Sequence, residues 1–580
     1  MLLTCFTERF LFDDRLIMYM LARKLVGHTI LHFKRKLLHR FLLGAKQSRL
    51  HQHTLLFNQL KKHADSDFGR QHHFRTIRSL DDFRHQLPIS DYDYFEPYIE
   101  RVKRGETTAL FHADTRVLMF ALTSGTTATP KFIPITETFL KRYRLGWQIW
   151  GVSVYDQHPR MRDAHILQLT SDWDSFRTEA DIPCGQISGL ATHTQGHITK
   201  MVYCVPEAVS KIADSTAKAY AALRFALCRE HIGMAMTANP STLTFLAKLG
   251  NQMKEGLVRD LHDGTLLSDL DISNEIRNQL EPYVRRREIS RARQLENIIR
   301  QTNTLLPKDY WNTLALLAVW TGGSVTPYLR ELPKYYGQVP VRDHGLSASE
   351  GRMTIPFQDD CSYGVLDYCS HFFEFVPKNE HGGVQPTILE AHELQEGQEY
   401  FILLTTASGL YRYDIQDLVR CVGFEAQAPL LEFLNKGNYF SSLTGEKLSE
   451  FQVVDAVDST MRDHQLTLGT FTVCPHWDDP PFYQLLIERS DLPEQHVNHP
   501  PFIERLANKV DKRLQVINME YRNKRETQRL ACLRIHLMPP DTWKLFRDQQ
   551  LNQGGSLEQF KHPRLVPQLD FLKKLNPHLP

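Results

Sequence analysis

The sequence predicts a mixed α/β fold that is divided into two domains. The chain has 580 residues, more than a single hydrophobic core usually organises. Apolar runs typical of buried strands, such as 117–122 and 314–320, stand beside longer segments with helical spacing, such as 139–154 and 206–229. Because 42% of the residues are hydrophobic and 23% are charged, the chain can bury large cores and is not disordered.

Charge and cysteine usage exclude several classes of protein. The formal net charge is only +2, with 69 basic against 67 acidic residues, so we expect no nucleic-acid partner. The basic helical region 271–306 alternates with glutamates, which favours a solvated helix face. The nine cysteines include no CxxC pair, which indicates reduced thiols and a cytoplasmic location. The chain also lacks an uninterrupted apolar run of about 18 residues, so we expect no transmembrane helix.

Residues 1–44 alternate apolar clusters with basic residues at roughly helical spacing. We expect this segment to form a helix that packs on the large domain. Binding of a basic amphipathic helix to an anionic membrane surface is the alternative. Neither an uninterrupted apolar core nor a cleavage site of a signal peptide is present.

The most informative stretch is 123–131, Thr-Ser-Gly-Thr-Thr-Ala-Thr-Pro-Lys, which follows the apolar run 117–122. Small hydroxyl residues around one glycine let backbone N–H and side-chain O–H groups converge on an anion, and Lys131 adds positive charge. The stretch therefore predicts a phosphate site, although it is not the usual P-loop, because Phe132 stands where a Ser or Thr would bind Mg²⁺. A Ser/Thr-rich surface turn is the alternative.

A second candidate is 346–351, Leu-Ser-Ala-Ser-Glu-Gly, between the extended stretches 339–342 and 353–355. A carboxylate at the end of a turn of small residues can hold Mg²⁺, which takes one or two carboxylates together with substrate phosphates. Glu350 is that carboxylate, and the small residues leave room for a flat base. A capped helix with an incidental glutamate is the alternative.

A third candidate is 411–420, which follows the strand-like run 400–406 and the turn 407–409. The pattern predicts a hairpin with Asp417 at its exit. An aspartate there can accept two hydrogen bonds from a ribose diol, and such charge-assisted bonds contribute about 1.5–3 kcal/mol each. A hairpin with alternating charges on its solvent-exposed face is the alternative.

In this order, the three segments resemble the arrangement of adenylate-forming enzymes, and within that class the Gretchen Hagen 3 (auxin-responsive) family of acyl acid amido synthetases. Further resemblance lies in 67–74, 98–105, 444–450 and 556–564, so it spans roughly residues 60 to 570. Three positions depart from the expected pattern. Ala128 stands where many adenylating enzymes have glycine, Gln416 stands where the family usually has glycine, and Leu346 replaces a common aromatic residue.

The resemblance implies a large N-terminal adenylation domain, with mixed sheets or a barrel flanked by helices, and a smaller mobile α/β domain. We expect an N-terminal helical segment at 1–60, the large domain at 61–430 and the small domain at 431–580. The segment 426–429 is expected to connect the two domains, and the hinge is expected near 417–434.

The resemblance also implies residue roles. The residues expected to bind the ATP phosphates are Ser124, Gly125, Thr126, Thr127 and Lys131, and Thr123 is included among the nucleotide-binding residues. Ser349 is assigned to adenine, Glu350 to Mg²⁺, and Asp417 to ribose, with Tyr411 included among the nucleotide-binding residues. Lys436, Lys447 and Lys561 are candidates to close over phosphate, and Lys131, Glu350 and Lys561 are expected to be catalytic.

The implied function is that of an AMP-forming ligase. It activates a small carboxylic acid as an acyl-adenylate and transfers the acyl group to an amino acid. Two alternatives are thioester formation with coenzyme A and a non-catalytic nucleotide-binding homologue. We expect a monomer.

Overall fold

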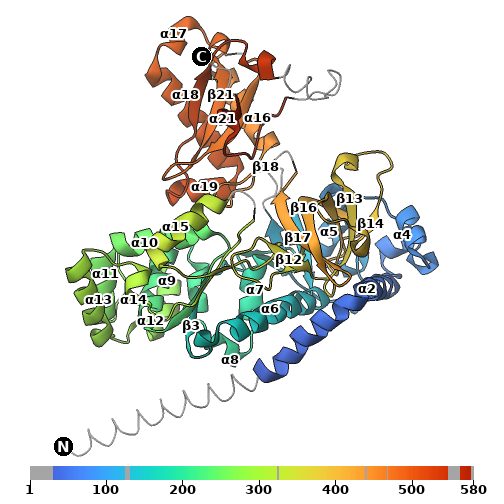
Figure 1. Cartoon of the computed structure of the whole chain (residues 1–580), viewed down its shortest axis with the longest axis horizontal. Coiled ribbons are helices and arrows are strands. Elements are labelled where there is room, and N and C mark those ends of the chain that lie inside the picture. Colours follow the sequence, from blue (N-terminus) through green and yellow to red (C-terminus); the bar gives the residue numbers. More distant parts are fainter. Residues whose placement is uncertain are drawn as a thin grey trace, which may run out of the picture.

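The structure is a computed structural model that describes residues 31–123, 131–322, 325–437, 440–466, 468–546 and 562–575. Several sheets with helices packed around them confirm the mixed α/β prediction. The chain forms a large N-terminal part and a smaller C-terminal part, which lies above the large part in the view of Figure 1. Among the described residues, we find no helix with the length and apolar character that a membrane span requires.

A parallel sheet with the strand order β3-β6-β7-β8 forms one layer of the large part. Its strands are β3 (His165–Gln168), β6 (Ile232–Met236), β7 (Leu316–Ala318) and β8 (Val341–Arg342). The helices of this region are α9 (Ser215–Leu227), α10 (Pro240–Gln252), α11 (Lys254–Asp263), α12 (Asn274–Val284), α13 (Ile289–Thr302), α14 (Pro307–Tyr310) and α15 (Thr326–Tyr336). The helix expected over 206–229 is shorter, because Asp214 accepts the Ala217 N–H at 2.6 Å and caps α9.

A seven-stranded antiparallel sheet forms a second layer, in the order β11-β12-β17-β16-β15-β13-β14. Its strands are β11 (Thr354–Ile355), β12 (Tyr363–Leu366), β13 (Phe372–Pro377), β14 (Leu389–Glu390), β15 (Glu399–Thr405), β16 (Tyr413–Glu425) and β17 (Ala428–Asn435). The antiparallel pair β15–β16 is the predicted hairpin.

The predicted connection at 426–429 is wrong. Ala426 and Gln427 form the tight turn between β16 and β17, and Ala426 has a φ of 55°. The segment expected as a hinge, 417–434, therefore lies within two paired strands of the large part. Residue 430 falls inside β17, so we propose a domain boundary after Asn435.

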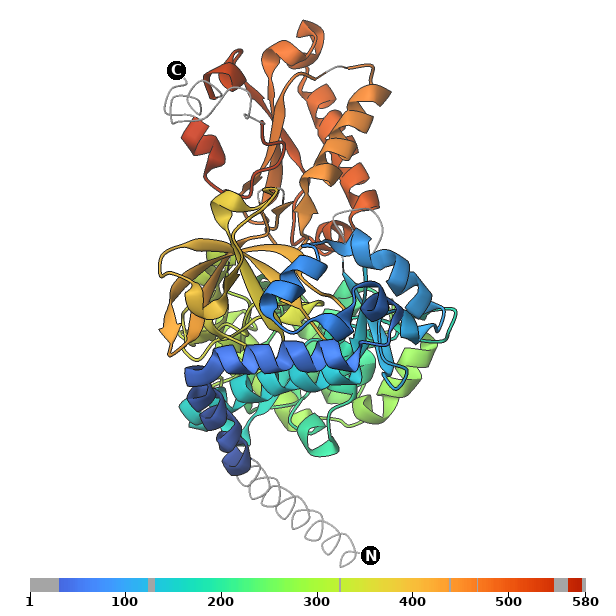
Figure 2. The same cartoon turned by 90° about the vertical axis from the view of Figure 1, so that its right-hand side faces the viewer.

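The third sheet, β2-β1-β5-β4, and the N-terminal helices complete the large part. The strands are β1 (Val117–Thr123), β2 (Lys131–Thr136), β4 (Phe176–Arg177) and β5 (Pro183–Gly185). The helices are α2 (Ser48–Lys62), α3 (Asp67–Gln71), α4 (Leu80–Gln86), α5 (Tyr92–Lys103), α6 (Glu137–Gln157), α7 (Ile187–His193) and α8 (His197–Lys200). α2 and α6 run side by side beneath the sheets (Figure 2).

The described part of the basic N-terminal segment packs on the large domain. Residues 31–44 are helical. Phe41 is buried and stacks on Tyr368 with 4.8 Å between the ring centres, and Arg35 forms a 2.7 Å ion pair with Asp156 near the end of α6. Residues 1–30 lie outside the described residues, so this packing concerns residues 31–44 alone.

The C-terminal part has its own core, which includes Val453, Val473, Leu485 and Leu506. Its sheet has the order β20-β21-β22. The elements are β18 (Phe440–Ser441), β19 (Leu448–Ser449), α16 (Glu450–Asp463), β20 (Phe471–His476), β21 (Phe482–Glu488), α17 (Glu494–Val497), α18 (Pro500–Ile517), α19 (Met519–Glu526), β22 (Arg534–Met538) and α21 (Phe571–Leu575).

Side-chain contacts join the C-terminal part to α10 of the large part. Lys248 forms a 2.6 Å ion pair with Asp479. Arg529 donates from Nη1 to Thr242 Oγ1 at 3.1 Å. Figure 1 shows α19 facing α10 and α15 at this contact. These polar contacts place the C-terminal part over the large part near the carboxyl ends of the parallel strands.

Candidate functional site

The carboxyl ends of the parallel strands meet at one edge, where Asp343 joins two loops. Its carboxylate accepts the N–H of Thr321 at 2.8 Å and the N–H of Gly345 at 2.6 Å. Asp343 thereby ties the loop after β7 to the loop after β8. Ligands of open α/β sheets bind outside such carboxyl ends. Sequence analysis missed Asp343, although an acidic residue directly after an extended stretch was an available signal.

Glu350 lies in the turn of a short hairpin at this edge. The hairpin pairs β9 (Ser347–Ala348) with β10 (Gly351–Arg352), so Ser349 and Glu350 are its two turn residues. Glu350 is only 5% exposed. Its negative charge acts on three ammonium groups, those of Lys131, Lys436 and Lys447.

The hairpin is held at its base by two backbone features. Gly345 has a φ of +95°, and a Cβ there would lie 2.2 Å from the Thr354 carbonyl oxygen, so only glycine fits. Leu346 donates its N–H to Thr354 Oγ1 at 2.9 Å and accepts the Met353 N–H at 2.8 Å. The Leu346 side chain is 7% exposed and belongs to the core, while its backbone fixes the hairpin.

Lys131 stands at the point where the predicted phosphate loop re-enters its sheet. Thr123, the last residue of β1, pairs with Lys131, the first residue of β2. The ammonium group of Lys131 lies 5.4 Å from the centre of the Tyr92 ring, a distance at which a cation–π attraction operates. The remaining loop residues, Ser124, Gly125, Thr126 and Thr127, lie outside the described residues.

Asp417 and Lys436 come together because β16 and β17 are paired. Leu418 pairs with Asn435, so the residues next to them, Asp417 and Lys436, become neighbours. Lys436 Nζ lies 3.5 Å from Asp417 Oδ1. Asp417 is 5% exposed, so its carboxylate sits in a shielded position beside one ammonium group.

Lys447 approaches from the C-terminal part. It is exposed and has a φ of 47°. The turn before it is held by Glu446, whose carboxylate accepts the N–H of Leu443 at 2.6 Å and of Thr444 at 2.7 Å. A Cβ on Gly445 would lie 3.5 Å from Asn239 Nδ2 of the large part, so this turn lies at the contact between the two parts.

The pKa shifts place these groups in one electrostatic cluster. Burial raises the pKa of the Asp417 carboxyl, and the ammonium groups of Lys436 and Lys447 oppose that rise. Burial lowers the pKa of Lys131, while Glu350 opposes and Lys436 adds to the lowering. For Lys436, burial lowers the pKa, but Asp417 and Glu350 outweigh burial and the pKa is raised. Two carboxylates and three lysines therefore act on one another in one place.

Tyr411 and Lys561, two residues that the sequence predicts for the site, are not among the described residues of the charged cluster. Tyr411 is 1% exposed, and its ring stacks on Phe68 with 5.4 Å between ring centres and meets Phe74 edge-on. Because its ring lies within this aromatic core, we leave Tyr411 out of the proposed site. Lys561 lies outside the described residues.

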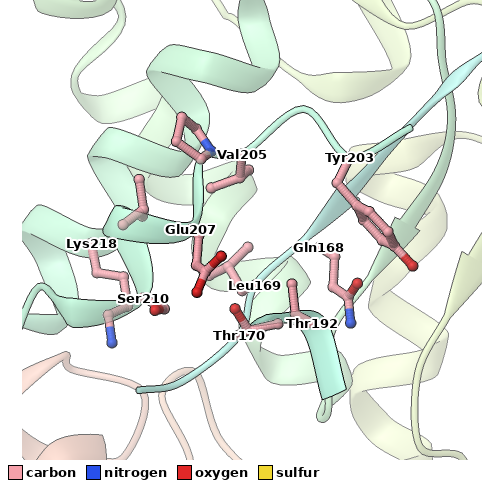
Figure 3. Close-up of a pocket in the computed structure, with 11 residues that line it drawn as sticks. Gln168, Leu169, Thr170, Thr192, Tyr203, Val205, Glu207, Ser210 and Lys218 are labelled. Carbon is pink, nitrogen blue, oxygen red and sulfur yellow. The ribbon is translucent and has the colours of Figure 1, made fainter. Parts of the chain in front are cut away.

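A small cavity lies beside the end of β3, next to the α7 region (Figure 3). Its volume is about 20 Å³, and its lining includes Gln168, Thr170, Glu207 and Lys218. Such a volume has room for about one water molecule. The cavity as it stands is therefore too small for a nucleotide or an acyl group.

The fold is that of a mixed α/β protein, with a cluster of two carboxylates and three lysines at the edge of its sheets. Comparison with protein families gives three matches: the GH3 family N-terminal domain over residues 37–341, the GH3 family central domain over 364–436, and the GH3 family C-terminal domain over 451–570. The chain belongs to the GH3 family, which confirms the resemblance found in the sequence.

Characterised relatives cover most of the chain. The jasmonoyl–L-amino acid synthetase JAR4 of Nicotiana attenuata is 24% identical over 506 residues, which are 83% of this chain and 85% of that protein. The indole-3-acetic acid-amido synthetase GH3.4 of Arabidopsis thaliana is 23% identical over 553 residues, 90% of each chain. The solved structure of the GH3.15 acyl acid amido synthetase is 20% identical, with a TM-score of 0.63 over 93% of this chain and 95% of that one. The last likeness shows the shared fold.

Proposed function

We propose that this chain is an ATP-dependent, AMP-forming acyl acid amido synthetase. Such a ligase activates a small carboxylic acid as an acyl-adenylate and transfers the acyl group to the amine of an amino acid. The observation that carries the proposal is the convergence of Lys131, Glu350 and Asp417, which come from three distant segments. The relatives described above are named as amino acid synthetases or amido synthetases, which supports the proposed activity.

Each group of the cluster has a role in binding ATP. Lys131 and the 124–127 loop bind the phosphates, where positive charge and N–H donors are needed. Asp417 accepts hydrogen bonds from the ribose diol, and the backbone at Ser349 lies against the base. Lys436 and Lys447 neutralise phosphate charge, and Lys561 joins them when the small domain closes.

Glu350 fits a magnesium ion. Mg²⁺ in nucleotide sites is bound by one or two carboxylates and by substrate phosphates, and the Glu350 carboxylate is shielded from solvent within the charged cluster. A site made of protein ligands alone does not fit, because the described residues contain no cluster of three or more metal-binding side chains. When bound, the ion supplies charge neutralisation to the leaving pyrophosphate.

The chemistry has two steps. A carboxylate oxygen of the acid attacks the α-phosphorus of ATP, and the bond from that phosphorus to pyrophosphate breaks. The amine of the acceptor then attacks the acyl carbon, AMP leaves with the bonding electron pair, and the amine proton passes to solvent. Lys131, Asp417 and the lysines beside them contribute by positioning and by charge neutralisation, which are the main demands of phosphoryl transfer.

Two alternatives differ in the acceptor or in the chemistry itself. A thiol such as coenzyme A can capture the same adenylate and give a thioester. A non-catalytic homologue would bind the nucleotide without turnover, an option that follows from the departures at Gln416 and Leu346.

A substrate screen separates these functions. The protein is incubated with ATP, Mg²⁺, a panel of aryl, indole and fatty acids, and mixed amino acids, and products are read by mass spectrometry together with pyrophosphate release. We expect pyrophosphate release and an amide with at least one acid. A product that forms only with coenzyme A would replace the proposal by thioester synthesis. Nucleotide binding without pyrophosphate release for any acid would favour the non-catalytic homologue.

We also propose a monomeric protein in the cytoplasm. The eight cysteines that the structure describes are free thiols, which suits a reducing compartment. Light scattering coupled to gel filtration tests the monomer, and imaging of a tagged full-length chain tests the location.

A further inference from the structure

Asp417 is presented by an irregular bulge in β16. Phe401 of β15 pairs with Leu418, and Leu403 pairs with Asp414. The three residues 415–417 therefore stand opposite the single residue 402. Such bulges re-aim side chains beside active sites. The course of the bulge decides where the Asp417 carboxylate points.

The bulge requires a backbone conformation that favours glycine, yet a glutamine occupies it. Gln416 has a φ of +61°, in the left-handed region where a Cβ is unfavourable. A non-glycine residue persists in such a conformation only when its surroundings over-determine it. Neighbouring groups must therefore hold the bulge in place.

Asp414 supplies one such restraint with both oxygens of its carboxylate. Oδ1 accepts the N–H of Gln416 at 2.8 Å, an arrangement that closes a tight turn over residue 415. Oδ2 lies 2.7 Å from His381 Nε2. The backbone N–H of Asp414 donates to the Ser90 carbonyl at 2.8 Å, so the start of the bulge is anchored as well.

His381 is itself fixed by the loop after β13. Its ring stacks on Phe401 of β15, with 3.7 Å between ring centres and 20° between ring planes. The loop is closed by Glu380, whose carboxylate accepts the Thr387 N–H at 2.7 Å. A rigid histidine therefore orients the Asp414 carboxylate, which in turn holds the N–H of Gln416.

We propose that His381 and Asp414 are positioning residues that hold the Gln416 conformation and so set the position of Asp417 for nucleotide binding. The inference rests on the proposed function, because it takes Asp417 as the group that binds ribose. Neither His381 nor Asp414 is assigned a contact with ATP. Together with Gln416 they form the 381–414–416 brace, which substitutes for the glycine that the bulge would otherwise need.

Titration calorimetry with Mg²⁺ and α,β-methylene-ATP tests the brace. Asp414→Ala removes both acceptor oxygens, and His381→Ala removes the group that orients them, so each should weaken binding about tenfold, as loss of a positioning group does. Asp414→Asn keeps an oxygen acceptor for the Gln416 N–H and should stay within about threefold of the wild type. His39→Ala, at an exposed histidine, is the control and should change nothing.

Rescue by glycine separates positioning from a general structural role. In the double variants His381→Ala/Gln416→Gly and Asp414→Ala/Gln416→Gly, the left-handed conformation no longer depends on the brace, so most of the lost affinity should return. Unchanged binding in both alanine variants, or a loss that Gln416→Gly does not reduce, would overturn the brace while the wild type still binds the nucleotide. A wild type that does not bind the nucleotide would overturn the proposed function, and the brace with it.

Discussion

Lys436 Nζ lies 3.5 Å from Asp417 Oδ1, so a single ion pair joins the end of β17 to the bulge of β16. Asp417 is 5% exposed and the Lys436 side chain is 27% exposed. The carboxylate is shielded from water, and burial alone raises its pKa. The ammonium group therefore helps to keep Asp417 ionised and able to accept hydrogen bonds from a ribose.

Asp417→Asn should weaken ATP binding without changing the affinity for the acceptor amine. The amide keeps the shape of the side chain but loses a charge-assisted acceptor, so we expect the KM for ATP to rise about 10- to 100-fold. Steady-state kinetics with ATP and amino acid varied in turn measure both constants. Asp541→Asn, at an exposed aspartate, is the control, and an unchanged KM for ATP in Asp417→Asn would argue against the ribose role.

Glu350→Gln should raise the Mg²⁺ concentration that gives half-maximal activity. Mg²⁺ depends on few protein carboxylates in nucleotide sites, and glutamine keeps the length of the side chain without its charge. A Mg²⁺ titration of pyrophosphate release measures the effect. The exposed Glu396→Gln serves as the control, and coincident Mg²⁺ curves for Glu350→Gln and wild type would remove Glu350 from the metal site.

Local patterns in the sequence predict the strands and turns around the site. They do not predict the long-range contacts that fix the conformation of those turns. Lys131 and Asp417 are predicted because a turn with distinctive chemistry follows each apolar run. The two runs form β1 and β15, and Lys131 and Asp417 lie on the next strands, β2 and β16. The segment 426–429 was misread as a linker. Small residues and proline occur in both linkers and hairpin turns, and only the pairing of β16 with β17 distinguishes them.

Long-range contacts account for the features that sequence reasoning missed. The absence of glycine at position 416 was visible in the sequence, but the partner that compensates for it was not. His381 lies 33 residues from Asp414, and no periodic pattern connects them. Asp343 likewise joins two loops through backbone N–H groups. Almost every residue type carries such a donor, so the sequence does not indicate which residues will form these bonds.

Lys131→Ala should lower adenylation about 100-fold or more, the range expected when one preorganised charge donor is lost. Pyrophosphate release with a saturating acid measures the rate. Lys308→Ala removes an exposed lysine and should leave the rate unchanged. Release at the wild-type rate from Lys131→Ala would exclude the lysine from the phosphate site.

His63 should make the protein sensitive to acid. It is 4% exposed and its Nδ1 accepts the His112 N–H at 3.0 Å, and burial, with help from the Lys62 charge, lowers its pKa to about 3. Because the pKa of His63 is lower in the folded than in the unfolded protein, the folded state keeps its full stability above the unfolded pKa of about 6.5 and loses it as the pH falls from there toward 3. At pH 5 the loss of unfolding free energy is about 2 kcal/mol.

His63→Gln tests this contribution, because glutamine can accept the same N–H and does not titrate. Denaturant unfolding at pH 8 and pH 5 should show a smaller loss of unfolding free energy in the variant than in the wild type. His39→Gln, at an exposed histidine, should behave like the wild type. An equal loss in His63→Gln and wild type would show that His63 does not contribute to the acid sensitivity.

Lys561 should act only in the first half-reaction. The described segment that begins at His562 is anchored in the C-terminal part, since Arg564 accepts the Val473 N–H at 2.8 Å and donates its own N–H to Glu450 at 3.0 Å. Lys561 lies 430 residues after Lys131 in the sequence and belongs to the small domain, so we expect it to act on the phosphates only when that domain closes further on the large one. We therefore expect domain closure to bring its charge to ATP during adenylation.

Lys561→Ala should reduce pyrophosphate release about 100-fold and keep the Tm within a few degrees of the wild type, as expected for a substitution that leaves the core intact. Given a chemically prepared acyl-adenylate, the same variant should form the amide at the wild-type rate, because that step needs only the bound adenylate and an amine. Lys544→Ala removes an exposed lysine of the same domain and should leave both steps unchanged. Normal pyrophosphate release from Lys561→Ala would refute the lysine's role. Wild-type protein that consumes the adenylate only with coenzyme A would refute amide synthesis instead, so the two failures are distinguished in one set of assays.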